Sequence, residues 1–334
     1  MKFNFKIQQY QTDAVDAVVR VFQGQGFHDK ISYIRDRGKV KAEPYQMTLG
    51  MSDEELEVID PLNDTGYKNE AVELSDEQLL HNIQTLQSQN NIKLSASLVK
   101  DLGRCSLDIE METGTGKTYV YIKTMFELNK KYGWSKFIVV VPSIAIREGV
   151  KKSFEITADH FMEHYGKKAR FFIYNSSNLN QLDNFSSSSG INVMIINMQA
   201  FNSGKNQRII DKALDSFRSR RPIDIIAKTN PILIIDEPQS VEGKQTKESL
   251  KKFNPLFTLR YSATHREAYD MIYRLDAMDA YNQHLVKRIA ALGVTLTGST
   301  ATNGYVYVEG IDLYKNKAPT ARLGFEVKGA GGTR

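Results

Sequence analysis

The chain has 334 residues, a formal net charge of +5 and a hydrophobic content of 41%. This length allows one sizeable core together with insertions or a second lobe. No apolar run approaches the about 18 residues that a membrane span needs, and the first residues are too polar for a signal peptide, so we expect no membrane partner. A single cysteine, Cys105, excludes an internal disulfide and fits a reducing, cytoplasmic compartment.

The first 104 residues predict a helix followed by a long insertion. Residues 1–26 carry apolar side chains at helical spacing. Residues 27–104 lack such a repeat, except for a helix expected over 76–87 with Ser75 as its cap. Within the insertion, the stretch 53–77 has ten acidic residues and one lysine. The rest of the chain is therefore more basic than the net charge indicates, which would suit a polyanion partner. The alternative is that this stretch is only a solvated acidic insertion.

From residue 105 the sequence alternates between apolar runs and amphipathic stretches. The runs have the length of buried strands, and the stretches between them have the length of helices. Strands are expected at 106–111, 136–142, 170–175, 191–198, 231–236 and 257–261, helices at 118–133, 145–164 and about 205–218, and a Ser/Asn-rich loop at 175–190. This order predicts an α/β fold with a doubly wound parallel sheet over 105–265. Beyond it we expect a long helix over about 266–291, then strands at 294–299 and 305–311.

The segment Met111–Thr118 reads M-E-T-G-T-G-K-T and lies between a predicted strand and a predicted helix. Its glycines allow the backbone to wrap closely around phosphate with several N–H groups pointing inward. Lys117 can neutralise the β- and γ-phosphates of ATP, and the Thr118 hydroxyl can ligate Mg²⁺. Met111 stands where the strict P-loop pattern has glycine, and the alternative is a glycine-rich chain reversal. The predicted ATP-binding residues of this loop are Thr113, Gly114, Thr115, Gly116, Lys117 and Thr118.

Two consecutive carboxylates, Asp236 and Glu237, follow a run of buried aliphatic residues. Such a pair is costly at the end of a strand unless it holds a cation or moves a proton. Asp236 fits a Mg²⁺ ligand, and Glu237 fits a group that polarises the attacking water. We therefore expect Lys117, Asp236 and Glu237 to be the catalytic residues. The alternative is a capping Asp beside a solvated Glu.

The short string Ser262-Ala263-Thr264 gains meaning from its order in the chain. A P-loop, then D-E-x-x, then S-A-T resembles motifs I, II and III of superfamily 2 helicases and translocases. The resemblance implies a RecA-like first helicase lobe with a long insertion before the P-loop. It also implies that Gln239, Ser262 and Thr264 couple the ATP site to a DNA track, whereas His265 is expected to be structural.

Three further segments resemble motifs of the same superfamily. Tyr10-Gln11 resembles the adenine-reading glutamine motif, although its distance from the P-loop is longer than usual. Residues 139–150 and 195–203 resemble motifs Ia and Ib, which touch the nucleic-acid backbone in such motors. Arg147 would suit a DNA phosphate, or it is a solvated helix residue.

The strings DEPQSVEG, RYSATHRE and DAMDAYNQHLVKRIA together resemble the restriction subunit of type III restriction-modification enzymes. The resemblance implies an ATP-dependent motor that acts on double-stranded DNA with a methyltransferase (modification) subunit. Cleavage in that family comes from a separate C-terminal nuclease domain. We find neither a nuclease constellation nor the arginine motif of a second lobe, so we expect an N-terminal piece in which 266–334 leads to the second lobe. Such a piece should hydrolyse ATP weakly or not at all.

Other functions remain open at this point. A stand-alone superfamily 2 DNA repair helicase would carry the same motifs without a nuclease domain or a neighbouring methyltransferase gene. A P-loop kinase of a small metabolite would need a lid with catalytic arginines and no S-A-T. A non-catalytic DNA-binding scaffold with a vestigial nucleotide site would not need Lys117, Thr118, Asp236 and Glu237 intact.

Overall fold

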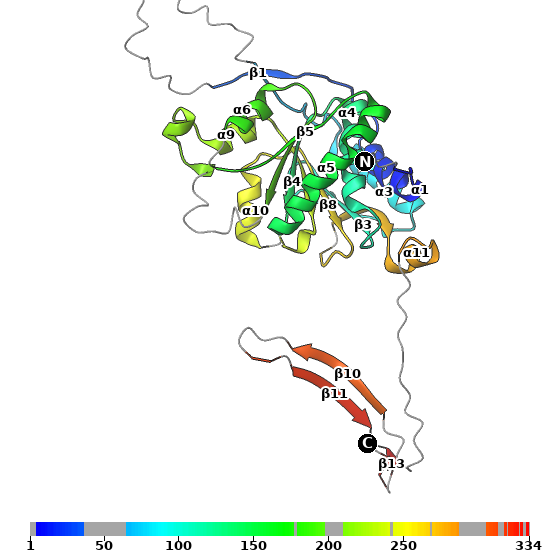
Figure 1. The fold of residues 1–334 in the computed structure, drawn as a ribbon. Coiled ribbons are helices and arrows are strands. Elements are labelled where there is room, and N and C mark those ends of the chain that lie inside the picture. Colours follow the sequence, from blue (N-terminus) through cyan, green and yellow to red (C-terminus); the bar gives the residue numbers. More distant parts are fainter. Residues whose placement is uncertain are drawn as a thin grey trace, which may run out of the picture. The chain divides into compact units, whose positions relative to one another are not determined.

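The computed structural model describes residues 5–36, 65–176, 179–197, 210–240, 243–267, 269–286, 305–312, 317–318, 320–326, 328–329 and 332–333. The chain divides into two compact units, Met1–Lys287 and Arg288–Arg334. In the second unit, β10 (Tyr305–Asp312) pairs with β11 (Thr320–Glu326), and β12 (Lys328–Gly329) pairs with β13 (Gly332–Thr333), both antiparallel (Figure 1). The strand expected at 305–311 is thus confirmed, and the one at 294–299 lies outside the described residues.

The first unit is built on a seven-stranded parallel sheet with the order β5-β6-β4-β7-β8-β3-β9. Its strands are β3 (Ser106–Met111), β4 (Lys136–Val141), β5 (Arg170–Ile173), β6 (Asn192–Asn197), β7 (Ile232–Asp236), β8 (Thr258–Ser262) and β9 (Asp270–Leu275). Six of them lie where the sequence predicts strands. The continuous apolar runs of β4, β6 and β7 fit a sheet that is covered on both faces.

Helices cover both faces of this sheet (Figure 1). On β4, Phe137, Val139 and Val141 belong to one apolar cluster, and the alternate residues Ile138 and Val140 belong to another. The first cluster includes side chains of α1 (Gln9–Val21), α3 (Asp76–Gln89), α4 (Lys117–Tyr132) and α5 (Ile144–Tyr165), and the second includes those of α6 (Asn180–Ser187), α9 (Pro222–Lys228) and α10 (Lys244–Lys251). The expected α/β class with a doubly wound parallel sheet is confirmed.

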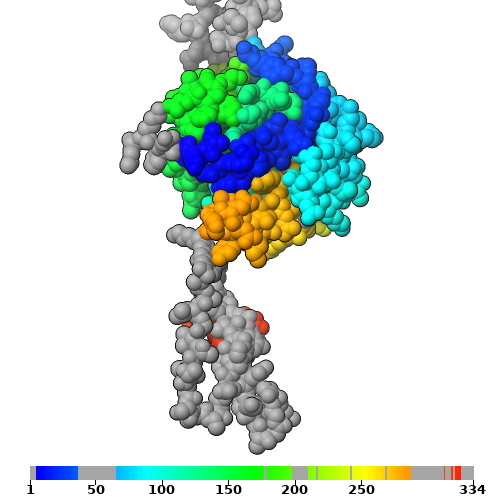
Figure 2. Space-filling model, turned by 90° about the vertical axis from the view of Figure 1, so that its right-hand side faces the viewer, coloured from blue at the N-terminus to red at the C-terminus, as the bar shows by residue number. Residues whose placement is uncertain are grey.

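Part of the predicted insertion is built into this unit. The strands β1 (Ser32–Ile34) and β2 (Thr65–Tyr67) pair antiparallel, and α3 begins at Ser75 with a capping box that Gln78 completes. Figure 2 shows α1 (blue) on the surface beside the cyan segment that carries α3, and the two helices pack together. The acidic residues between 53 and 64 lie outside the described part of the chain.

Asn69 fixes this segment to the sheet through its buried side-chain amide. Its Nδ2 donates to the carbonyls of Lys136 (2.8 Å) and Asn230 (3.0 Å). Its Oδ1 accepts from the backbone N–H groups of Ser135 (2.7 Å) and Lys136 (3.0 Å). One side chain thus provides hydrogen-bond partners for backbone groups at the start of β4 and just before β7.

The long helix expected over 266–291 is wrong. The chain forms β9 instead and then the short helix α11 (Ala277–Asn282), which begins at Asp276, whose side chain accepts from the N–H of Asp279 (2.9 Å). β9 pairs with the open edge of β3, with Leu107 opposite Asp270 and Met111 opposite Leu275. Pairing with a distant strand therefore overrides the local helical preference.

Two smaller expectations also differ from the structure. The predicted loop at 175–190 contains α6, because Leu182 and Phe185 lie three residues apart and are both buried. The helix expected over about 205–218 lies partly outside the described residues. Within them it gives way to a 3₁₀ turn at Asp215–Phe217 and a bridge between Leu214 and Arg220.

Candidate nucleotide-binding site

The P-loop connects β3 to α4 at the carboxyl edge of the sheet. Gly114 and Gly116 have φ angles of 84° and 91°, a conformation that residues with a side chain rarely adopt. No atom lies within 4 Å of the position that a Cβ of Gly114 would occupy, so the loop has free space there. Thr115 is buried, and its hydroxyl donates to the carbonyl of Glu112 (2.6 Å), whereas Thr113 is exposed. The hydrogen bond from Thr115 to Glu112 closes the turn.

Lys117 reaches from the start of α4 to the strand that carries the two acids. Its Nζ lies 3.2 Å from Oε1 of Glu237 and donates to the carbonyl of Met111 (3.3 Å). Both side chains of the ion pair are largely buried, with exposed fractions of 13% for the lysine and 25% for the glutamate. The structure therefore brings together two of the three residues predicted to be catalytic.

The predicted coupling residues surround the other oxygen of Glu237. Its Oε2 accepts from Nε2 of Gln239 (2.8 Å) and from the hydroxyl of Ser262 (2.9 Å). That hydroxyl also accepts from the N–H of Thr264 (3.3 Å). Glu237 has a φ of 56°, a strained conformation for a residue with a side chain, and it aims the carboxylate into this network. Lys117, Glu237, Gln239, Ser262 and Thr264 thus form one continuous set of contacts.

The two neighbouring acids have opposite pKa shifts. Burial raises the pKa of Asp236 to about 6, and the adjacent Glu237 carboxylate adds to this shift against the charge of Lys117. Burial also acts to raise the pKa of Glu237, but hydrogen bonds from Gln239 and Ser262 and the charge of Lys117 outweigh it, so that this pKa is lowered. Glu237 is therefore the carboxylate that stays ionised most readily.

The fit of Mg²⁺ can be judged from the donors near Asp236. Asp236 is 6% exposed at the carboxyl end of β7, and Thr118 is the second residue of α4, at the same edge of the sheet. Both lie close to the phenol of Tyr121, whose pKa is raised by burial and by the Asp236 carboxylate, with the Thr118 side chain opposing the rise. A hydroxyl and a carboxylate are hard oxygen donors of the kind that Mg²⁺ prefers. The donor set fits the ion.

Tyr10 and Gln11 contact the P-loop directly, despite their distance from it in the sequence. The Tyr10 hydroxyl and Nε2 of Gln11 both donate to the carbonyl of Thr115, each at 3.0 Å. A Cβ on Gly116 would lie only 2.5 Å from that same Nε2. Glycine at 116 is therefore favoured by its φ angle, and a Cβ there would also displace the amide of Gln11.

Arg147 lies in the first turns of α5, which begins at the carboxyl edge of the sheet after β4. Its guanidinium donates to the Glu148 carboxylate through Nε (3.2 Å) and Nη2 (2.8 Å). It lies near the end of the sheet that carries the P-loop, but it already has an acidic partner. Of the segment 195–203, the structure describes only 195–197, at the end of β6.

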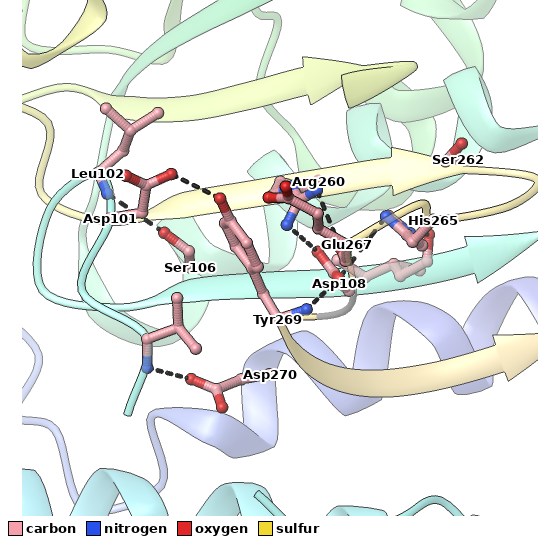
Figure 3. Close-up of polar contacts among 12 residues, drawn as sticks. Asp101, Leu102, Ser106, Asp108, Arg260, Ser262, His265, Glu267, Tyr269 and Asp270 are labelled. Atoms are coloured by element: carbon pink, nitrogen blue, oxygen red, sulfur yellow. Dashed lines mark hydrogen bonds and ion pairs between the residues drawn. The ribbon is translucent and has the colours of Figure 1, made fainter. Parts of the chain in front are cut away.

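Four residues beside the site were not singled out as functional from the sequence. The side chains of Asp108, Arg260 and His265 are buried and, with the half-buried Tyr269, form a polar cluster near Ser262 (Figure 3). A signal was present, because S-L-D-I-E-M and T-L-R-Y-S alternate strictly between polar and apolar residues. Reading the first run simply as an apolar strand concealed that alternation.

A family model described as "Type III restriction enzyme, res subunit" matches residues 4–267. The chain belongs to this family. The EcoP15I Res subunit of Escherichia coli is 36% identical over 243 residues, which cover 66% of this chain and 25% of that protein. The EcoPI Res subunit of Escherichia phage P1 is 34% identical over 245 residues, again 66% of this chain and 25% of that protein. The chain thus spans about a quarter of the length of the curated Res relatives that it matches.

Two further observations accompany the Res assignment. Among solved structures, the Sulfolobus solfataricus SWI2/SNF2 ATPase core in complex with dsDNA matches 59% of this chain and 33% of that one, at 13% identity and a TM-score of 0.34, a likeness too weak to carry an argument. Within the described residues, no helix has the length and apolar character to cross a membrane.

Proposed function

We propose that this chain is the ATP-binding motor lobe of a DNA-dependent translocase from a type III restriction endonuclease. The observation that carries the proposal is the unbroken set of contacts from Lys117 through Glu237 to Ser262 and Thr264. It joins the three motifs of a nucleotide-driven motor within one site. In this proposal the lobe expected over 105–265 extends through β9 to Leu275, because that strand pairs with β3, and 1–26 contribute the adenine-reading helix. The residues that follow lead to a second lobe.

The geometry suggests how the site would handle ATP. The backbone around Gly114 would receive the phosphates, and Lys117 would leave Glu237 to neutralise them. Thr118 and Asp236 would hold Mg²⁺, which neutralises charge that develops on the phosphates. Glu237, freed from Lys117 and kept ionised by Gln239 and Ser262, would then polarise the attacking water.

The adenine end of the site is proposed at Tyr10 and Gln11. An amide side chain can pair with both the donor and the acceptor on the adenine edge. In the structure, Nε2 of Gln11 donates to the Thr115 carbonyl, so this amide is in direct contact with the phosphate loop. Binding of the base would therefore be linked to the shape of the loop.

Coupling to DNA is proposed through Gln239, Ser262 and Thr264, which link the water-polarising Glu237 to the carboxyl edge of the sheet. Double-stranded DNA is the proposed track, with Arg147 as a candidate phosphate contact once it leaves Glu148. The methyltransferase subunit is the proposed partner that reads the DNA site, in the cytoplasm. Cleavage would come from a nuclease domain outside this chain.

The proposal is tested by titrating a non-hydrolysable ATP analogue with Mg²⁺ against the wild type, Lys117→Ala and Lys130→Ala. Lys130 is an exposed lysine in the last turn of the same helix, so its substitution controls for charge and helix propensity. We expect Lys117→Ala to weaken binding at least about tenfold, since it removes the cation that faces the phosphates. Equal affinities of the Lys117→Ala and Lys130→Ala variants would overturn the proposal. The lobe alone is expected to hydrolyse ATP weakly, and rapid DNA-stimulated hydrolysis by it would contradict that part.

A further inference from the structure

Strands β3 and β8 carry polar side chains on a face where β4 and β7 are apolar. Their apolar residues, such as Ile109 and Leu259, belong to the cluster on the opposite face. The polar residues form three pairs directly across from one another: Ser106 with Thr258, Asp108 with Arg260, and Glu110 with Ser262. All except Glu110 are buried. The last pair ends in the hydroxyl that contacts Glu237, so this polar face leads into the ATP site.

The middle pair is a buried ion pair. Nη1 of Arg260 lies 3.2 Å from Oδ1 of Asp108, and the side chains are 4% and 0% exposed. Removing two charges from water costs more than their attraction returns unless further hydrogen bonds and contacts satisfy them. Those partners come from one short segment of the chain.

That segment is the connection from β8 to β9, residues 263–269, of which Ala268 lies outside the described part. Parallel strands are usually joined by a dozen or more residues that include a helix. Here seven residues connect β8 to β9, which lies on the far side of β3. The buried pair supplies hydrogen-bond partners to the backbone of this connection. Oδ2 of Asp108 accepts from the N–H of Tyr269 (2.8 Å), and Nη2 of Arg260 donates to the carbonyl of Glu267 (3.3 Å). The Tyr269 ring lies 3.6 Å from the guanidinium carbon (Figure 3).

The same connection begins with the coupling residues. Thr264 contacts Ser262, and His265, the next residue, lies between the site and the buried pair. The His265 ring is 1% exposed, with Nδ1 3.6 Å from Asp108 and Nε2 3.5 Å from the carbonyl of Ile109. Asp108 therefore contacts the connection at His265, directly after Thr264, as well as at Tyr269.

We propose that Asp108 and Arg260 are positioning residues of the ATPase site. Neither touches the nucleotide. They clamp the β8–β9 connection onto β3, the strand that leads into the P-loop, and so hold Ser262 and Thr264 in register with Glu237. The inference rests on the proposed ATPase function. It differs from a purely structural role because it predicts a loss in the chemical step that is separate from nucleotide binding.

The test measures DNA-stimulated ATP hydrolysis by the complete Res subunit, assembled with its methyltransferase, for wild type, Asp108→Asn and Arg260→Gln. We expect kcat to fall about ten- to a hundredfold, because a small displacement of the coupling residues costs rate, whereas the KM for ATP and the affinity for an ATP analogue change less than about twofold. Arg274→Gln is the matched control. It removes an ion pair with Glu110 on the same strand, Nε to Oε1 3.1 Å, and Arg274 is 53% exposed.

Two further variants distinguish a loss of positioning from a simple loss of folding. The double substitution Asp108→Asn with Arg260→Gln leaves no uncompensated charge, and we expect it to recover part of the lost kcat. Tyr269→Leu removes the ring over the guanidinium but keeps the ion pair, and it should lower kcat without altering analogue binding. Folded variants with wild-type kcat, or variants that lose kcat and analogue affinity in parallel, would overturn the inference. If the wild type itself bound no ATP analogue, the proposed function would fail instead.

Discussion

Lys117 and Glu237 form an ion pair, with Nζ 3.2 Å from Oε1. Each residue is thereby kept from the role proposed for it until phosphates compete for the lysine. We predict that Glu237→Gln binds an ATP analogue at least as tightly as the wild type, because Lys117 is released and a negative charge near the phosphates is lost. Hydrolysis by the complete subunit with DNA should fall at least about a hundredfold, since the water loses its base. Analogue titration and phosphate release measure the two effects, and a tenfold weaker analogue affinity would contradict the competition.

Gly116 and Gly114 allow a test of the contact between α1 and the P-loop. Alanine at either position adopts an unfavourable φ and should cost about 1 kcal/mol of unfolding free energy. Alanine at 116 also places a Cβ 2.5 Å from Nε2 of Gln11, so Gly116→Ala should cost more. Adding Gln11→Ala should recover part of the loss for Gly116→Ala and none for Gly114→Ala. Urea unfolding without nucleotide measures all four variants, and equal responses of the two glycines would rule out the close contact.

Asn69 is predicted to be the main anchor of the segment 65–104. Asn69→Ala leaves buried N–H and carbonyl groups at the start of β4 without partners, and we expect a loss of about 3 kcal/mol in unfolding free energy. Asn82→Ala is the control, because Asn82 donates to the carbonyls of Val21 (2.9 Å) and Gln23 (3.0 Å) where water can replace it. We expect that variant to lose about 1 kcal/mol. Equal losses in urea unfolding would show that the segment is not anchored at Asn69.

Lys136 gives a stability effect that depends on pH. Burial lowers the pKa of this lysine to about 7, and its amine donates to the carbonyls of Phe185 (2.6 Å) and Ser188. Between pH 7 and the ordinary lysine pKa of 10.5, the unfolded chain binds a proton that the folded chain has lost, so stability rises with pH. Relative to Lys136→Met, the wild type should therefore gain about 1.4 kcal/mol per pH unit from pH 7 to 9. A difference between the wild type and Lys136→Met that does not change from pH 7 to 9 would refute the shift.

The sequence predicts well where the signal is local. The strands β4, β6 and β7 have continuous apolar runs, α3 has its Ser75 cap, and the Gly-Lys-Thr string lies between a strand and a helix, so each could be located from neighbouring residues. The convergence of Lys117, Glu237 and Ser262 could be expected as well, because the carboxyl ends of parallel strands meet at one edge of a sheet.

What the sequence did not reveal depends on contacts between distant residues. D-M-I-Y-R-L at 270–275 has mixed polarity and becomes β9 only because the edge of β3 is free to pair with it. Asp108 and Arg260 look like exposed positions of amphipathic strands, and only the connection that covers them makes them buried. Asn69 belongs to no sequence pattern, since its four hydrogen bonds reach residues 66, 67 and 161 positions away.

The position of β3 in the sheet has a consequence for how this unit folds. Its two neighbours, β8 and β9, are the last strands of the sheet to be synthesised, and the contact between Asp108 and Tyr269 spans 161 residues. Before β8 and β9 have been synthesised, the strand that leads into the P-loop has two open edges, although the helices that cover its apolar face are already made. Closing such long loops is slow, and a chain released early would expose an aggregation-prone strand. The nucleotide site, which carries the earliest motif of the sheet, is thus among the last parts to be completed.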